Sequence, residues 1–195
     1  MALFPKLICC LFIAGTLGDF QTSDLGLQFH YDYKLKQEFE TETKVRQYIK
    51  DLVKNLNVIF QNRTFLQQHN LSAPAKFKKC PSVYSKDQLI YKMMKGSGQN
   101  ITSESAGSFF RDAGAQQWKE WIAAIVYFLI PDTHAAEDNA IFSSVTTPGG
   151  GCSKNCVTAV SGTHFNHSVE QPAAYNLAKL IAGSACLKNK KTSNA

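Results

Sequence analysis

Hydrophobic and polar residues alternate strictly between Leu25 and Lys34. A period of two over ten residues predicts a β-strand, whose apolar side carries Leu25, Leu27, Phe29, Tyr31 and Tyr33. From Glu38 to Asn62 the apolar residues instead recur every three or four positions. This spacing predicts an amphipathic helix of about six turns. Thr41 suits the N-cap of this helix, because its hydroxyl can accept a hydrogen bond from a free backbone N–H.

The rest of the chain contains further segments of these two kinds. Trp121 to Ile130 is a continuous apolar run that ends at a proline, which is typical of a strand buried on both faces. Ser103 to Glu120 predicts a second helix, whose expected core residues are Phe109, Phe110, Ala113 and Trp118. We also expect short strands at 75–80, 140–145 and 156–160, a short helix at 87–95 and a helix at 171–186. This order predicts an α/β domain with a mixed, largely parallel sheet and helices on both faces.

The helix predicted from Gln171 to Cys186 is small and apolar enough to be buried in the domain. Pro172 suits the first helical position, where its missing N–H costs nothing. Gly183 suits the position just after the helix, which is often left-handed. The residues that we expect to face the core are Ala173, Ala174, Leu177, Ala178, Leu180 and Ile181.

The first 18 residues have the features of a secretory signal peptide. Lys6 precedes an apolar run, Leu7 to Ala14, and small residues stand at the expected cleavage site. This run is too short to span a bilayer, which takes about 20 apolar residues, and no other run is long enough. We therefore expect a secreted, extracellular protein with a single domain at residues 19–187 and a basic, flexible tail at residues 188–195.

Cleavage of the signal peptide would also remove two of the six cysteines. Four cysteines in an oxidising compartment predict two disulfides, for which three connectivities are possible. A zinc site built from the same residues is the alternative, but only two of them are close together in the sequence. The four cysteines are Cys80, Cys152, Cys156 and Cys186.

Four N-glycosylation sequons agree with secretion, and each predicts a position at the surface. They begin at Asn62, Asn70, Asn100 and Asn166. The formal net charge is +6, or +5 without Lys6. Basic residues cluster at Lys76–Lys79 and in the tail at Lys188–Lys191, and either cluster could contact an anionic glycan. No basic stretch has the aromatic spacing of a nucleic-acid platform, so we expect no nucleic-acid partner.

Two stretches of the chain resemble the reprolysin branch (ADAM and snake-venom type) of the metzincin metalloproteases. The segment from Tyr175 to Cys186 has the spacing of the zinc helix of this family, H-E-x-x-H-x-x-G-x-x-H-D. The N-terminal strand and long helix are similar as well. Their matching residues are Asp32, Phe39, Thr41, Tyr48-Ile49 and Val53-Lys-Asn55. The resemblance implies the N-terminal subdomain of a metzincin, with the C-terminal subdomain missing.

The same resemblance places the zinc chemistry of the family on unsuitable residues. The first zinc histidine falls on Tyr175, the general-base glutamate on Asn176, the second histidine on Lys179 and the third on Ala185. A catalytic zinc needs three protein ligands and an open position for water. Tyr175 is a poor neutral ligand, Lys179 brings a positive charge, and Asn176 cannot accept a proton. Zinc is the expected cofactor of the family, but the resemblance implies neither a metal site nor catalytic residues here.

The resemblance also implies a substrate-binding segment. In reprolysins, an edge strand that holds the substrate backbone precedes a Gly-rich turn and a cysteine. The corresponding residues are Ala140, Phe142, Val145, Gly149, Gly150 and Gly151, followed by Cys152, whose partner stays open. The glycines do not form a phosphate loop, because no Lys-Ser/Thr pair follows them.

The histidines give no convincing metal site. His164 and His167 could share a metal if they were helical, but the sequon between them favours a glycosylated loop. His30, His69 and His134 are isolated in the sequence, and we expect them to face solvent.

Together these features predict a secreted metalloprotease-family protein without catalytic activity, of the type found in arthropod saliva or venom. Its expected partner is an extracellular protein or peptide, added as a strand at residues 140–151. The alternative is a disulfide-linked glycoprotein that binds an extracellular host ligand and has no protease ancestry. A truncated or alternatively spliced product is a third interpretation.

Overall fold

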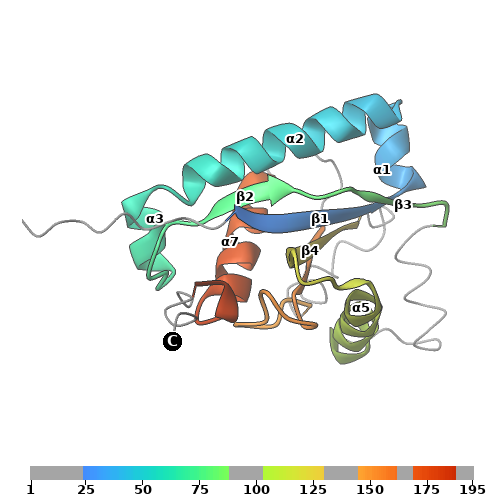
Figure 1. Cartoon of the computed structure of the whole chain (residues 1–195). Coiled ribbons are helices and arrows are strands. Elements are labelled where there is room, and N and C mark those ends of the chain that lie inside the picture. Colours follow the sequence, from blue (N-terminus) through green and yellow to red (C-terminus); the bar gives the residue numbers. More distant parts are fainter. Residues whose placement is uncertain (1–23, 88–102, 130–144, 162–168, 188–195) are drawn as a thin grey trace, which may run out of the picture.

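A computed structural model describes residues 24–87, 103–129, 145–161 and 169–187. Its centre is a parallel β-sheet, in which β1 lies between β2 and β4, and β5 pairs with the other side of β4 (Figure 1). A short strand, β3, continues the β2 side of β1. Every strand pairing in the described residues is parallel, which confirms the α/β class. The strands are β1 (Asp24–Asp32), β2 (Lys76–Lys79), β3 (Val83–Ser85), β4 (Ile122–Leu129) and β5 (Val157–Ser161).

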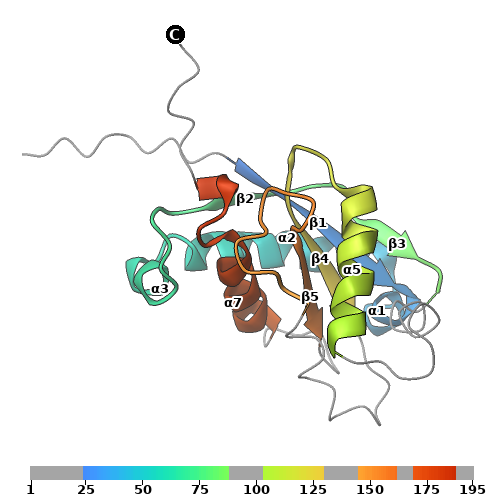
Figure 2. The ribbon, with the colours of Figure 1, turned by 90° about the horizontal axis from the view of Figure 1, so that it is seen from below.

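Helices cover both faces of this sheet. α2 and α7 contribute to one hydrophobic core, and α5 contributes to a second core on the opposite face. Figures 1 and 2 show α2 and α5 on opposite sides of the strands. The helices are α1 (Tyr33–Glu38), α2 (Glu42–Ile59), α3 (Arg63–Gln68), α5 (Ser103–Gln117), α7 (Glu170–Ile181) and a 3₁₀ helix (Ala185–Leu187).

The predicted first strand is confirmed but ends earlier than expected. Asp32 accepts hydrogen bonds from the backbone N–H groups of Lys34 at 3.0 Å and Leu35 at 3.4 Å, so it caps α1. Strand pairing on both sides and helices on both faces bury β1 almost completely. His30 is therefore only 3% exposed, and the expectation that it faces solvent is wrong.

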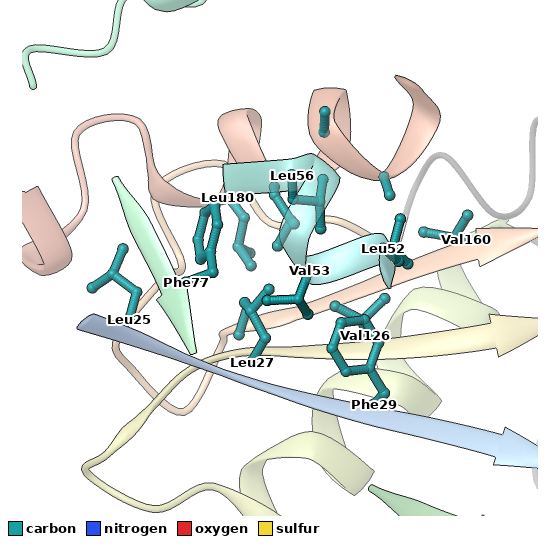
Figure 3. Close-up of a cluster of buried hydrophobic side chains, with 14 of the residues drawn as sticks. Leu25, Leu27, Phe29, Leu52, Val53, Leu56, Phe77, Val126, Val160 and Leu180 are labelled. Atoms are coloured by element: carbon teal, nitrogen blue, oxygen red, sulfur yellow. The ribbon is translucent and has the colours of Figure 1, made fainter. Parts of the chain in front are cut away.

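The long amphipathic helix is also confirmed, and Thr41 caps it by accepting a hydrogen bond from Lys44 N at 3.2 Å. Its apolar face packs onto β1, β2 and β4 and against α7 (Figure 3). On the other face of the sheet, Phe110 of α5 is fully buried, whereas Phe109, Ala113 and Trp118 are partly buried.

The predicted C-terminal helix begins one residue early, at Glu170, so Pro172 occupies the third helical position. A proline still fits there, because the first N–H groups of a helix have no intrahelical partner. Gly183 follows the C-cap with φ +68°, the left-handed conformation that glycine adopts without strain.

Several predicted elements lie outside the described residues. They are the signal peptide at 1–18, most of the short helix at 87–95, the edge strand up to residue 144, most of the basic tail at 188–195, His134, His164, His167, and the sequons at Asn100 and Asn166.

Candidate functional site around the C-terminal helix

One face of α7 is buried against the sheet and α2. Asn55 Nδ2 on α2 donates a hydrogen bond to Glu170 Oε1 at 2.6 Å, at the first turn of α7. The small residues of the buried face let the helix approach the strands closely, and they include Ala173, Ala174, Leu177 and Ala178. The opposite face of α7 exposes Tyr175 and Lys179.

The positions matched to zinc ligands do not form a ligand set. Tyr175 is 56% exposed, and its ring meets the imidazole of His69 edge-on, with centroids 5.5 Å apart. Lys179 is exposed on the next turn, and Ala185 is exposed in the 3₁₀ helix. No group of three His, Cys, Asp or Glu side chains suited to a metal occurs in the described ranges. A zinc ion therefore does not fit the side chains of Tyr175, Lys179 and Ala185.

Asn176, at the position of the family's general base, has a structural contact. Its Nδ2 donates a hydrogen bond to the backbone oxygen of Ala159 in β5 at 3.0 Å. The side chain is half-buried and ties α7 to the sheet. A glutamate at the same position would bring a carboxylate, which only accepts hydrogen bonds when ionised, against a carbonyl oxygen.

The Gly-rich turn closes the C-terminal end of α7. Gly149 N donates to Lys179 O at 3.1 Å, and Gly151 N donates to Leu180 O at 2.9 Å. These two carbonyls belong to the last turn of the helix, where carbonyls lack intrahelical partners. Gly149 has φ +69°, a conformation that favours glycine. The glycine N–H groups are therefore occupied within the protein.

The other residues of the expected substrate-binding segment are placed only in part. Val145 lies in a turn and is fully buried in the core beneath α5. Gly150 and Gly151 are buried as well. Strand addition in this segment therefore remains a prediction for Ala140 and Phe142, which lie outside the described residues.

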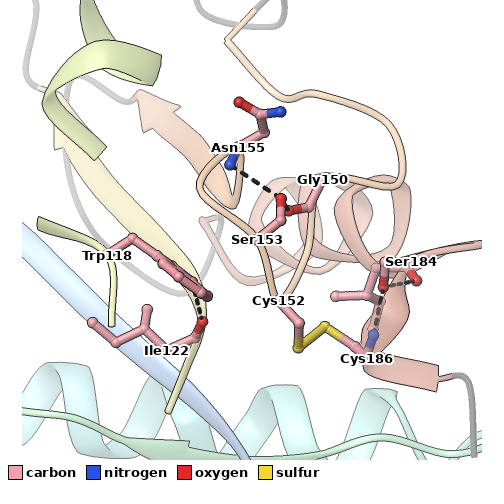
Figure 4. Close-up of a disulfide and its surroundings, with 9 residues drawn as sticks. Trp118, Ile122, Gly150, Cys152, Ser153, Asn155, Ser184 and Cys186 are labelled. Carbon is pink, nitrogen blue, oxygen red and sulfur yellow. Dashed lines mark hydrogen bonds between the residues drawn. A yellow bond between two sulfur atoms is a disulfide. The ribbon is translucent and has the colours of Figure 1, made fainter. Parts of the chain in front are cut away.

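A disulfide joins the turn to the segment after α7. Cys152 and Cys186 are bonded, with their Cα atoms 5.3 Å apart (Figure 4). Cys152 N also donates to Ala123 O of β4 at 3.0 Å, so the turn connects the sheet, α7 and the 3₁₀ helix.

The second predicted disulfide does not form. Cys80 and Cys156 are both free and buried. Cys80 lies beside β1 and Cys156 lies beside β4. Three strand spacings separate them, about 14 Å, whereas bonded cysteines need Cα atoms less than about 7 Å apart. Burial raises the pKa of the Cys156 thiol to about 12, so this thiol stays protonated at neutral pH.

The two described sequons are at the surface, as predicted. Asn62 is exposed and caps α3, since its Oδ1 accepts from Thr64 N at 2.9 Å and Phe65 N at 3.2 Å. These bonds use only the oxygen of the side chain, so its nitrogen can carry a glycan. Asn70 is exposed with φ +53°.

Sequence reasoning missed a pair of buried polar rings beneath α5. His30 of β1 and Tyr127 of β4 are register partners, with ring centroids 4.7 Å apart. His30 Nε2 lies 3.2 Å from Gln28 Oε1, and burial lowers the pKa of His30 to about 4. The Tyr127 hydroxyl is buried without a hydrogen-bond partner in the described part of the chain, and burial raises its pKa. The central place of β1 in a parallel sheet was the available indication of this burial.

No protein-family model matches the chain, and a search of the curated proteins finds no match either. Within the described segments, no helix has the length and hydrophobicity needed to cross a membrane.

Proposed function

We propose that the chain is a secreted, metzincin-like protein that has lost proteolytic activity and acts by binding an extracellular protein or peptide. Asn176 carries this proposal. The residue matched to the general base is an amide, and it holds α7 on β5 through Ala159. It cannot take a proton from an attacking water.

The packing of α2 against α7 supports the metzincin-like part of the proposal. The two helices lie in one core, and Asn55 bonds Glu170 across them. Asn55 belongs to the N-terminal stretch that carries the resemblance, and Glu170 lies on α7, the helix that contains Tyr175 of the C-terminal stretch. The alternative, a binding glycoprotein without protease ancestry, predicts no particular placement of these two stretches within its core.

Secretion is supported by the Cys152–Cys186 disulfide and by the exposed sequons at Asn62 and Asn70. Disulfides persist in oxidising compartments, and glycosylated asparagines lie at the surface.

The deciding experiment measures zinc and proteolysis together. The purified, glycosylated protein is dialysed, its zinc content is determined by elemental analysis, and hydrolysis of casein is followed with and without added zinc. We expect almost no bound zinc. We also expect no zinc-dependent hydrolysis of casein, that is, none that a chelator would abolish. One zinc per chain would contradict the proposal.

Two variants provide positive controls. Y175H/K179H places two imidazoles four residues apart on the exposed face of α7, where they can share a zinc ion. Adding A185H supplies the third ligand that the family spacing requires, so the triple variant should bind zinc more tightly than the double variant. Equal affinities would show that the spacing match has no structural meaning.

A further inference from the structure

The β2 edge of the sheet is covered by amide side chains of α2 and of the turn that follows it. Asn57 Nδ2 donates to Phe77 O at 3.0 Å, and Asn57 Oδ1 accepts from Phe77 N at 2.6 Å. In the turn after α2, Gln61 Nε2 donates to the backbone oxygen of Ala75, just before β2, at 3.2 Å. Free N–H and C=O groups on an edge strand invite another strand to pair. These bonds occupy three such groups, so they oppose the addition of a peptide strand at this edge.

Two lysines extend this side of α2. Lys50, Lys54 and Asn57 follow one another at intervals of four and three residues. Helical residues with this spacing lie on one face. Both lysines are exposed, so the helix face that contacts β2 continues as a basic row.

β2 supplies further lysines at this edge. Because side chains alternate along a strand and Phe77 is buried beneath α2, Lys76 and Lys78 project from the opposite face of the sheet. Lys76 and Lys78 are exposed, and Lys79 is half-buried. α2 runs antiparallel to β2, as its amide contacts and Figure 1 show. With rises of about 1.5 Å per helical residue and about 3.3 Å per strand residue, Lys54 lies level with Lys78 and Lys79.

Acidic residues compensate little of this charge. Lys76 pairs with Asp24 at 3.3 Å. Within the described residues, Lys50, Lys54, Lys78 and Lys79 form no ion pair. Positive charges gathered from two separate elements create a field that attracts an anionic partner.

We propose that this basic edge, formed by Lys50, Lys54, Lys76, Lys78 and Lys79, binds a sulfated glycosaminoglycan. These lysines flank the edge strand from both faces of the sheet, where a linear polyanion running along the edge can contact them, and each ammonium group offers three donors to sulfate oxygens. Single-stranded nucleic acid would require aromatic side chains for base stacking, but Phe77 between the lysines is buried. The site lies on α2 and β2, apart from the exposed face of α7, and it does not depend on the proposed loss of proteolysis.

The test is binding of the full secreted protein to immobilised heparin at increasing sodium chloride concentrations. Affinity should fall steeply with salt, because charge contacts are screened and counterions are released. K54Q/K78Q should weaken binding about 30-fold, or about fivefold per lysine. The matched control K44Q/K154Q removes the same charge at exposed positions elsewhere, and its affinity should change less than about twofold.

Four results would overturn the proposal. Equal losses in the two double variants would indicate attraction by net charge alone. Equal affinity for unsulfated hyaluronan would remove the role of sulfate, and equal affinity for a single-stranded oligonucleotide would indicate a different polyanion. A loss in K188Q/K190Q/K191Q with none in K54Q/K78Q would place the site on the tail. Since Lys54 and Lys78 are exposed, K54Q/K78Q should unfold at the same temperature as the unmodified protein.

Discussion

The two faces of the sheet bury polar groups in different ways. On the face covered by α2 and α7, polar side chains bond between elements, as Asn57 does with Phe77. On the face covered by α5, His30 and Tyr127 lie side by side, and the Tyr127 hydroxyl has no partner in the described residues. An unpaired buried hydroxyl costs about 1–3 kcal/mol. The α5 face therefore contains groups that reduce stability.

This difference separates two kinds of expected behaviour. The α2/α7 face includes the disulfide, the closed end of α7 and the amide-covered strand edge, so changes there should destabilise the protein at every pH. Changes to His30 or Tyr127 should instead act through pH or increase stability. Each substitution below tests one side of this contrast.

The largest effect is expected from C152S/C186S. The disulfide closes a loop with a sequence separation of 34. Loss of this constraint on the unfolded chain should lower the free energy of unfolding by about 4 kcal/mol, measured by urea denaturation. The unmodified protein in reducing agent is the control and should match the variant. A loss below about 1 kcal/mol would show that the backbone bonds of Gly149 and Gly151 hold the turn without the disulfide.

The next effect concerns His30 and depends on pH. Burial lowers its pKa to about 4, whereas the unfolded value is about 6.5. The unfolded chain therefore binds a proton more readily, and stability falls as the pH drops from about 6.5 to about 4. The full loss below that range is about 3 kcal/mol.

His30→Leu removes this titration while keeping a similar volume. Urea denaturation of both proteins at pH 7, 5.5 and 4 separates the contribution of His30 to the pH dependence of stability from that of the carboxylates, because the carboxylates titrate in both proteins. The difference in stability should shift in favour of the variant as the pH falls. A difference that stays constant with pH would show that the imidazole reaches solvent in the folded protein.

Local patterns were sufficient to predict the elements of the α2/α7 face. Period-two alternation located β1, 3–4 spacing and Thr41 located α2, and the continuous apolar run located β4. These patterns were informative because each element has a burial pattern set by its own geometry. The burial of His30 could not be read in the same way, because it depends on strands and helices that β1 meets only in the folded domain.

Pairings between residues that are distant in the chain could not be predicted from the sequence for the same reason. Four cysteines predicted two disulfides. The strand order keeps Cys80 and Cys156 apart, so the structure has the Cys152–Cys186 disulfide and two free cysteines. Pro172, Gly183 and the apolar residues between them predicted the helix, whereas the contact of Asn176 with β5 appears only in three dimensions.

A smaller effect is expected from Asn57→Ala on the β2 edge. It removes two hydrogen bonds to the backbone of Phe77, each worth about 1 kcal/mol, so the free energy of unfolding should fall by about 2 kcal/mol. Gln47→Ala is the matched control, since Gln47 lies on the same helix and its amide bonds the exposed Asp51. A loss in Asn57→Ala no larger than in the control would mean that water replaces the amide at the edge.

The smallest effect should have the opposite sign. Tyr127→Phe deletes a buried hydroxyl that has no hydrogen-bond partner in the described residues and keeps the ring that packs on His30 and Phe110. Removing the unpaired group should raise the free energy of unfolding by about 1 kcal/mol, measured at pH 7, where His30 is neutral. Tyr175→Phe is the control, because Tyr175 is 56% exposed. A less stable Tyr127→Phe protein would show that the hydroxyl is hydrogen-bonded in solution, and the contrast between the two faces would then rest on His30 alone.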